Sequence, residues 1–139
     1  MVGESKIDLY SICGFFSDPN FTKRTQSETI IKLGFGGYFK YNQLTKKFGD
    51  GRLIDILGPA SIQGFMDNEK LEFEKNYDRG VPIKYKFKKI NNLWHGEWKI
   101  NRHDGYNAKG ESVALTSLVT ENAESIICRT EGNVLGQFI

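Results

Sequence analysis

Few residues of this chain have the type and spacing that metal binding or nucleophilic catalysis requires. The cysteines, Cys13 and Cys128, are far apart in the sequence, and the two histidines are His95 and His103. No CxxC pair and no Cys/His spacing typical of zinc is present, so the sequence predicts no metal and no other cofactor. Isolated cysteines of this kind are most often buried and inert.

One short stretch, Arg102-His103-Asp104, does combine residue types used in catalysis. Arg102 would hold a carboxylate or phosphate, and Asp104 would orient His103 as a base. An ordinary charged turn contains the same residues, and we favour that interpretation because surface turns are rich in polar side chains. The sequence therefore favours a protein that is not an enzyme, with Arg102 and His103 kept as candidate ligand-binding residues in a loop.

Lys75 is unusual because it interrupts an apolar face. It lies between Phe73 and Tyr77 in a segment of alternating pattern, so a strand would turn all three side chains to the same side. An unpaired ammonium group in an apolar interior is costly or loses its proton. We favour a lysine near a solvated rim, whose head extends into water. The alternatives are an acidic partner, for which Asp55 is a candidate, or an anionic ligand inside a cavity.

The segment 69–100 that contains Lys75 has the clearest pattern of the chain. Apolar and polar residues alternate over 71–77, 83–90 and 93–100, with turn residues between these stretches. Alternation of this kind indicates strands with one buried face. The segment therefore predicts three antiparallel strands joined by two tight connections.

The first predicted hairpin has a register that satisfies both faces at once. Pairing Tyr77 with Ile83 places Phe73 opposite Phe87 and Lys75 opposite Tyr85. On the other face the same register places glutamates opposite lysines, which stabilises an antiparallel pair. A slip of one residue would turn the apolar set outward.

The second predicted hairpin turns at Asn91-Asn92. Asparagine tolerates positive φ, so a two-residue hairpin loop fits this dipeptide. Pairing Ile90 with Leu93 then sets Tyr85 opposite Trp98 and keeps the aromatic face continuous across three strands.

The remaining β-rich stretches complete an all-β domain. They are 6–16, 27–41, 52–57, 60–66 and 110–119, with turn-rich links at 42–51 and 101–109 and short apolar ends at 125–129 and 134–139. Gly34, Gly36 and Gly37 suit a bend or a close strand approach better than a phosphate loop. Because no long helical pattern occurs, we predict one domain over 1–139, a single antiparallel up-and-down β-barrel of about eight strands. One of the apolar ends would close the sheet or pack under it.

Composition agrees with this fold and narrows the partners. Hydrophobic residues make up 39% of the chain and aromatic residues 13%, with 15 glycines and 3 prolines. The net charge of +2, from 19 basic and 17 acidic residues, is too balanced to predict nucleic acid or a membrane as the partner. No apolar run of signal-peptide or transmembrane length is present, so we expect a cytoplasmic protein.

Three segments resemble the calycin superfamily, which contains lipocalins, fatty-acid-binding proteins and avidin-like barrels. They are the meander 71–100 with Trp94-His95-Gly96-Glu97-Trp98, the run Gly-Arg-Leu-Ile-Asp-Ile-Leu-Gly at 51–58, and Ile62-Gln63-Gly64 after it. The Gly-x-Trp that many lipocalins carry near the N-terminus is absent, with Gly14-Phe15-Phe16 as the nearest match. The biotin-binding residues of avidin have no counterpart at matching positions. The resemblance implies a calycin-like barrel that holds a small molecule, without naming it.

Our leading hypothesis is a non-catalytic barrel that binds a small, partly apolar ligand in an aromatic-lined interior. The partner that we expect is a small apolar or anionic molecule. The predicted ligand-binding residues are Lys75, Tyr77, Tyr85, Trp94, Trp98, Arg102 and His103. The alternative is a protein-interaction or homo-oligomerisation module with a filled core. A barrel enzyme that uses Arg102, His103 and Asp104 is the third hypothesis.

Overall fold

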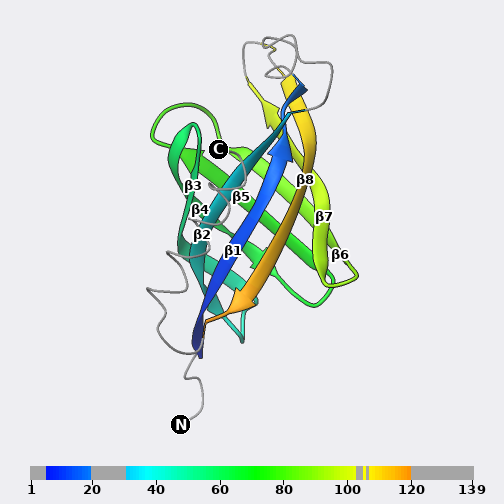
Figure 1. Cartoon of the computed structure of the whole chain (residues 1–139). Coiled ribbons are helices and arrows are strands. Elements are labelled where there is room, and N and C mark those ends of the chain that lie inside the picture. The colour runs from blue at the N-terminus through cyan, green and yellow to red at the C-terminus, as the bar shows by residue number, and fades with distance from the viewer. Residues whose placement is uncertain (1–5, 20–30, 103–104, 106, 120–139) are drawn as a thin grey trace.

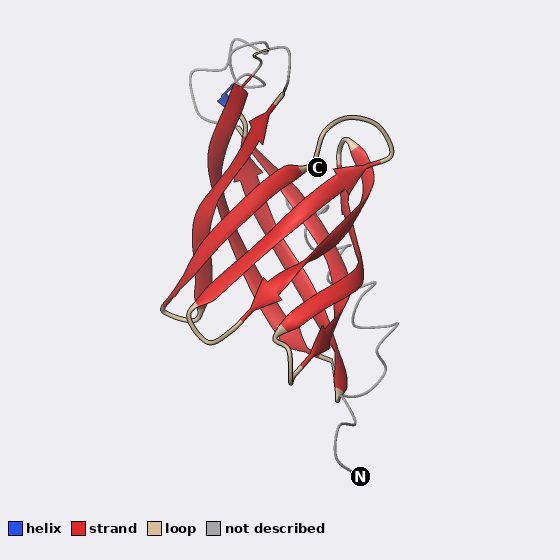
Figure 2. Ribbon diagram, turned by 180° about the vertical axis from the view of Figure 1, so that it is seen from behind, coloured by secondary structure: helices blue, strands red, loops and turns tan. Residues whose placement is uncertain are grey.

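In the computed structural model eight antiparallel strands form one closed β-barrel, shown from two sides in Figures 1 and 2. The structure describes residues 6–19, 31–102, 105 and 107–119. The strands are β1 (Ile7–Ser17), β2 (Lys32–Asn42), β3 (Lys47–Asp55), β4 (Gly58–Met66), β5 (Lys70–Tyr77), β6 (Ile83–Ile90), β7 (Leu93–Asn101) and β8 (Asn107–Leu118). We call the end at which β1, β3, β5 and β7 finish the upper end, as it is in Figure 1.

Each strand pairs with its neighbour in the sequence, and β8 pairs with β1 to close the barrel. This confirms the predicted all-β, up-and-down architecture. The closing strand is β8, which overlaps the predicted stretch 110–119. The two apolar ends at 125–129 and 134–139 lie outside the described residues, as does Cys128.

The predicted link 42–51 was too long, because β3 already begins at Lys47. The turn itself is short, and the Lys46 amide donates to the Asn42 carbonyl at 2.8 Å. The turn-like residues Gly49-Asp50-Gly51 belong to an irregular part of β3. The register of β3 shifts on both sides near Gly49 and Asp50, and Asp50 has a φ of 49°. Bulges use glycine and positive φ as turns do, so composition alone does not separate them.

The two predicted registers of the meander had different outcomes. In the β6–β7 hairpin Ile90 pairs with Leu93 and Tyr85 with Trp98, as predicted. Asn91 and Asn92 have φ values of 51° and 67°, which a type I′ turn requires.

The β5–β6 register was wrong by two residues. Phe73 pairs with Tyr85 rather than Phe87, and Lys75 pairs with Ile83 rather than Tyr85. A shift of two residues leaves every side chain on its predicted face, and it again sets glutamates opposite lysines, at Glu72 and Glu74. The alternating pattern therefore cannot separate these two registers, and the longer connection 78–82 does not fix one.

The barrel interior is an aromatic core. Phe73, Tyr85 and Trp98 are all buried there, as the meander predicted. Ring contacts extend from Tyr85 to Phe73 at 4.8 Å and to Phe35 at 6.5 Å between centroids. Gly37 permits one close strand approach, since a Cβ atom there would lie 1.8 Å from the carbonyl oxygen of Arg52.

Candidate functional site

The most unusual feature of the interior is a buried ion pair near the upper end. Lys75 is 0% exposed and Asp55 4% exposed, and the Lys75 Nζ contacts Asp55 Oδ2 as an ion pair. The rim interpretation of Lys75 was therefore wrong, and the alternative with Asp55 as its partner is confirmed. Barrel closure causes this, because Asp55 ends β3 and Lys75 lies near the end of β5, so both inward side chains reach the same end.

The carboxylate of Asp55 is held by two further donors. The Leu57 amide donates to Oδ1 at 2.8 Å, which fixes the turn between β3 and β4. The Tyr77 hydroxyl donates to Oδ2 at 2.5 Å. A buried carboxylate with three donors keeps its charge at a lower cost than an isolated one.

Aromatic rings surround the ammonium group of Lys75. Its Nζ lies 4.9 Å from the ring centroid of Phe16, 4.7 Å from that of Tyr77 and 5.7 Å from that of Tyr85. A cation over ring faces is stabilised electrostatically, most strongly where water is excluded. We call Asp55, Lys75, Tyr77, Tyr85 and Phe16 the lysine cage.

Burial shifts the protonation equilibria of the lysine cage. It lowers the pKa of Lys75, and the nearby charge and hydrogen bond of Asp55 oppose that shift. Burial also raises the pKa of Tyr77, with further contributions from its hydrogen bond to Asp55 and the carboxylate charge. Burial and the Asp55 charge raise the pKa of Tyr85 as well. Both phenols therefore stay protonated well above neutral pH.

Partly exposed apolar residues lie around the lysine cage at the upper strand ends. They are Ile31, Ile83, Ile100 and Ala108, and all four pack against the core. Tyr77, the last residue of β5, is half-buried, and its ring lies beside the Lys75 ammonium. It is the most exposed of the three rings around this ammonium, since Phe16 and Tyr85 are buried.

The predicted site residues fall into separate groups. Lys75, Tyr77 and Tyr85 belong to the lysine cage, and Trp98 lies at the same end, with its indole Nε1 donating to the Ser17 carbonyl at 2.8 Å. Trp94 is buried on the side towards the lower end, where its Nε1 donates to Thr116 Oγ1 at 3.0 Å.

The remaining site predictions concern the residues after β7. Arg102 is exposed directly after this strand, and His103 lies outside the described residues. Sequence reasoning missed Phe16, whose place in the cage depends on barrel closure. It named Asp55 only as a candidate partner, from its position between two isoleucines.

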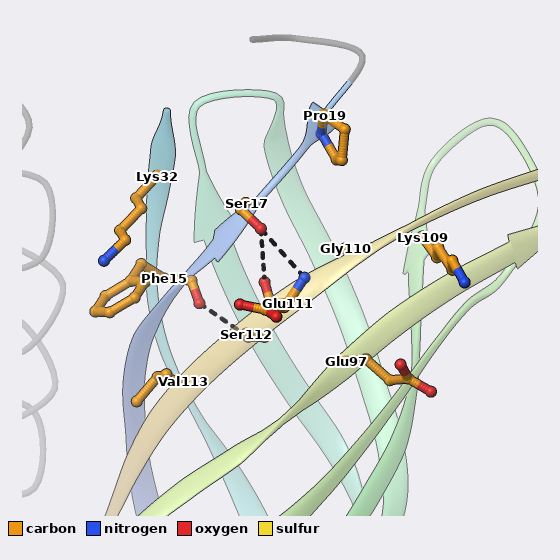
Figure 3. Close-up of a pocket in the computed structure, with 10 residues that line it drawn as sticks. All are labelled: Phe15, Ser17, Pro19, Lys32, Glu97, Lys109, Gly110, Glu111, Ser112 and Val113. Atoms are coloured by element: carbon orange, nitrogen blue, oxygen red, sulfur yellow. Dashed lines mark hydrogen bonds between the residues drawn. The ribbon is translucent and has the colours of Figure 1, made fainter. Parts of the chain in front are cut away.

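Three grooves lie on the outer wall of the barrel rather than inside it. The first has a volume of about 880 Å³ and follows the upper part of the seam between β1 and β8 (Figure 3). Its lining residues are Phe15, Ser17, Pro19, Lys32, Glu97, Lys109, Gly110, Glu111, Ser112 and Val113. The other two lie over β3–β6 and over β5–β8. Over the described residues, every buried side-chain nitrogen and oxygen has a hydrogen-bond partner.

The described residues contain no group of three side chains placed to ligate a metal. None of their helices has the length and apolar character that crossing a membrane requires. Comparison with protein-family models, with curated proteins and with solved structures finds no match to this chain.

Proposed function

We propose that the barrel binds a small, partly apolar molecule with an oxygen-bearing head group in the upper part of its interior, at the lysine cage. The observation that carries the proposal is the fully buried Lys75 ammonium among aromatic rings. Binding sites are mostly apolar with a few placed polar groups, and the cage has this composition.

Stability alone does not account for a buried charge pair. Removing two charges from water costs free energy that their attraction rarely returns in full, and apolar residues of similar volume often serve a core as well or better. Titratable groups with strongly shifted pKa values also concentrate at functional sites. Both arguments favour a role for Lys75 and Asp55 in binding.

The charges of the cage define the head group of the ligand. The Lys75 ammonium has three N–H donors, and Asp55 Oδ2 is the acceptor that it contacts among the described residues. The pair is neutral overall, so a carbonyl, a hydroxyl or an un-ionised acid adds an acceptor without adding a charge. An anionic head group would instead have to displace Asp55 from Lys75 or be accompanied by a proton.

The apolar body of the ligand would lie against the half-buried residues at the upper strand ends. Ile83, Ile100 and Ala108 offer apolar surface there. A ligand at Lys75 would displace the Tyr77 ring, which is the most exposed of the rings around the ammonium group. A small ligand therefore fits this proposal better than a long chain.

Tryptophan fluorescence tests the proposal, because the two tryptophans lie at different ends of the barrel. Trp98 reports on the upper end, and the Trp94→Phe variant isolates its signal. We would titrate this variant with medium-chain carboxylic acids, aromatic acids, and the matched aldehydes, alcohols and amides. Saturable binding should change Trp98 emission, whereas Trp98→Phe should lose the response. No saturable change with any compound, in fluorescence and in thermal shift, would refute the proposal.

A double variant separates binding from folding. Lys75→Met with Asp55→Leu removes both charges at similar volume, so the barrel should stay folded and lose the ligand response. Lys89→Met is the matched control, since its ammonium lies over Trp94 at 5.2 Å. Unchanged binding by the double variant would exclude the lysine cage as the site.

The packed core favours one other candidate function. An interaction or homo-oligomerisation module needs no cavity, and a cluster of buried aromatic side chains lies in the barrel interior. Light scattering coupled to size exclusion would support that candidate by a stable dimer or tetramer. Membership of the calycin superfamily and a cytoplasmic location remain predictions.

A further inference from the structure

The seam that closes the barrel is shorter than the strands that form it. β1 and β8 pair from Tyr10 with Leu118 to Phe16 with Ser112, which makes seven residue pairs. β8 continues upward from Glu111 to Asn107, and there it pairs with β7 alone. One edge of upper β8 is therefore left without a neighbouring strand among the described residues.

A serine hydroxyl ends the seam in place of a backbone pair. The Glu111 amide donates to Ser17 Oγ at 3.2 Å, and this hydroxyl lies 3.4 Å from the Glu111 carbonyl oxygen (Figure 3). Both backbone groups of Glu111 thus point towards β1. Backbone direction alternates along a strand, so the amide and carbonyl of Lys109 point to the same side. Within the described part of the chain, no backbone partner lies on that side of Lys109.

A row of like charges ends at this open edge. Lys84 pairs with Lys99, and Lys99 pairs with Lys109, so three lysines lie side by side on the outer wall of β6, β7 and β8. None of the three lysines forms an ion pair among the described residues, and Lys84 has one acidic neighbour, Glu74, opposite it on β5. Like charges directly opposite each other destabilise a sheet. An acidic partner would relieve this repulsion.

We propose that the upper edge of β8 binds an extended acidic peptide as an added β-strand. The peptide backbone would pair with the amide and carbonyl of Lys109, which are the groups that a neighbouring strand uses. An acidic side chain opposite Lys109 would continue the lysine row with the opposite charge. This inference concerns the outer wall and does not depend on the lysine cage.

The groove on the outer wall of the seam borders this edge of β8. Its volume of about 880 Å³ lies beside Lys109, Gly110 and Glu111. Figure 3 shows the Lys109 side chain pointing out from β8 while Ser17 faces Glu111 across the seam. Because Ser17 already occupies the backbone groups of Glu111, the peptide would begin above this residue.

Lys109 could also have the opposite role, which is to prevent a peptide from pairing with this edge. Lysines on an exposed edge often protect a sheet against pairing with other chains. On that interpretation Lys109 excludes peptides, and its removal increases binding. The two interpretations predict opposite signs for the same variant.

Fluorescence polarisation with labelled, capped pentapeptides tests the inference on the full chain. A peptide of alternating valine and glutamate should bind saturably, and its lysine analogue should bind at least about tenfold more weakly, since that peptide repeats the charge of the row. Two N-methylated versions of the glutamate peptide are compared, one methylated at its valines and one at its glutamates. Each version blocks every second backbone N–H donor of the peptide. One of these two should lose binding, because an added strand pairs through alternate residues.

Two substitutions at one position separate backbone pairing from charge. Lys109→Ala removes the charge and should weaken binding severalfold, with less effect at high salt. Lys109→Pro removes the charge and the edge amide, and an edge strand tolerates proline there. It should therefore weaken binding about tenfold beyond Lys109→Ala. Lys88→Ala is the matched charge control on the outer wall of β6 and should bind like the wild type.

Several results would overturn the inference. They are the absence of saturable binding by the wild type, equal binding by Lys109→Ala and Lys109→Pro, and stronger binding by Lys109→Ala. A further result would assign the lysine row to free anions instead. In that case inorganic triphosphate would compete with the peptide, and Lys109→Pro and Lys109→Ala would bind the peptide equally well. Circular dichroism verifies that the variants are folded, and the N-methylated peptides test the wild type directly.

Discussion

The lower and upper halves of the barrel interior are built from different chemistry. In the lower half Phe39 stacks on Tyr10 with ring centroids 5.6 Å apart and contacts Phe48 at 4.1 Å. In the same half the Tyr41 hydroxyl donates a hydrogen bond to the Met66 carbonyl at 2.6 Å. The upper half instead contains the buried charges of the lysine cage.

This difference separates stability from binding within one core. Aromatic packing gains free energy from burial and from ring contacts, with no charge to desolvate. The lysine cage has to offset desolvation with hydrogen bonds, ring contacts and a salt bridge. The lower half therefore contributes mainly to the stability of the fold. In the upper half, part of the free energy gained by burial is offset by the cost of desolvating polar groups. The following predictions test this division, from the largest expected effect to the smallest.

The lower half should show the largest loss from a single truncation. Phe39 is 0% exposed and contacts two rings, so Phe39→Ala should lower the free energy of unfolding by about 3–5 kcal/mol. Urea denaturation measures the change. Phe65→Ala, at a partly exposed position of β4, is the control and should cost much less. Equal losses at the two positions would contradict a core that depends on this aromatic cluster.

Breaking the upper ion pair should cost almost as much, but replacing both partners should not. Asp55→Leu leaves Lys75 buried without its partner, and the loss should be about 3 kcal/mol at pH 7. Adding Lys75→Met should recover most of this stability, because no charge then remains to be desolvated. A double-mutant cycle by urea denaturation measures the coupling. Additive losses would mean that the two side chains are not coupled, which would contradict a role for this ion pair in the stability of the barrel.

The lysine cage should also make the stability of the barrel depend on pH in alkaline solution. Tyr85 has a pKa raised by burial, so its contribution to stability is complete below pH 10, the ordinary pKa of tyrosine, and is lost as pH rises further. The loss should reach at most about 1.4 kcal/mol per pH unit for each such tyrosine. Lys75 acts oppositely, because its lowered pKa makes stability rise with pH up to its ordinary pKa of 10.5.

Denaturation between pH 8 and 11 tests this titration. Tyr85→Phe should flatten the fall in stability above pH 10, with the phenol removed and the ring retained. An unchanged slope would mean that this phenol does not control the alkaline transition.

The sequence predicted some features of the barrel and missed others. Alternation predicted the apolar faces of the meander, and Asn91-Asn92 fixed the β6–β7 register because a two-residue turn allows a single pairing. The β5–β6 register failed because a longer connection permits shifts of two residues without moving a side chain to another face. Trp94 and Trp98 share one face of β7, and their spacing of four positions along the strand places them towards opposite ends of the barrel.

The lysine cage could be predicted only in part, for a similar reason. Lys75 was found as an exception to its pattern, but its burial depends on a contact between β3 and β5 that no local pattern specifies. The edge of upper β8 that has no neighbouring strand among the described residues had no sequence signal, since it arises from where β1 stops pairing. Features that depend on local periodicity could thus be predicted from the sequence, whereas features that depend on how the strands close into a barrel could not.

The smallest expected effect is at the lower turn, where sequence and structure agree most closely. Asn92 has a φ of 67°, a conformation that glycine adopts at no steric cost and that favours glycine at this position of a type I′ turn. Asn92→Gly should raise the free energy of unfolding by about 0.5 kcal/mol, whereas Asn92→Ala should lower it by about 1 kcal/mol. The shift of the urea midpoint measures both changes. If the two variants shift it in the same direction, positive φ is not what selects the residue, and the register of this hairpin depends on side-chain pairing across β6 and β7 instead.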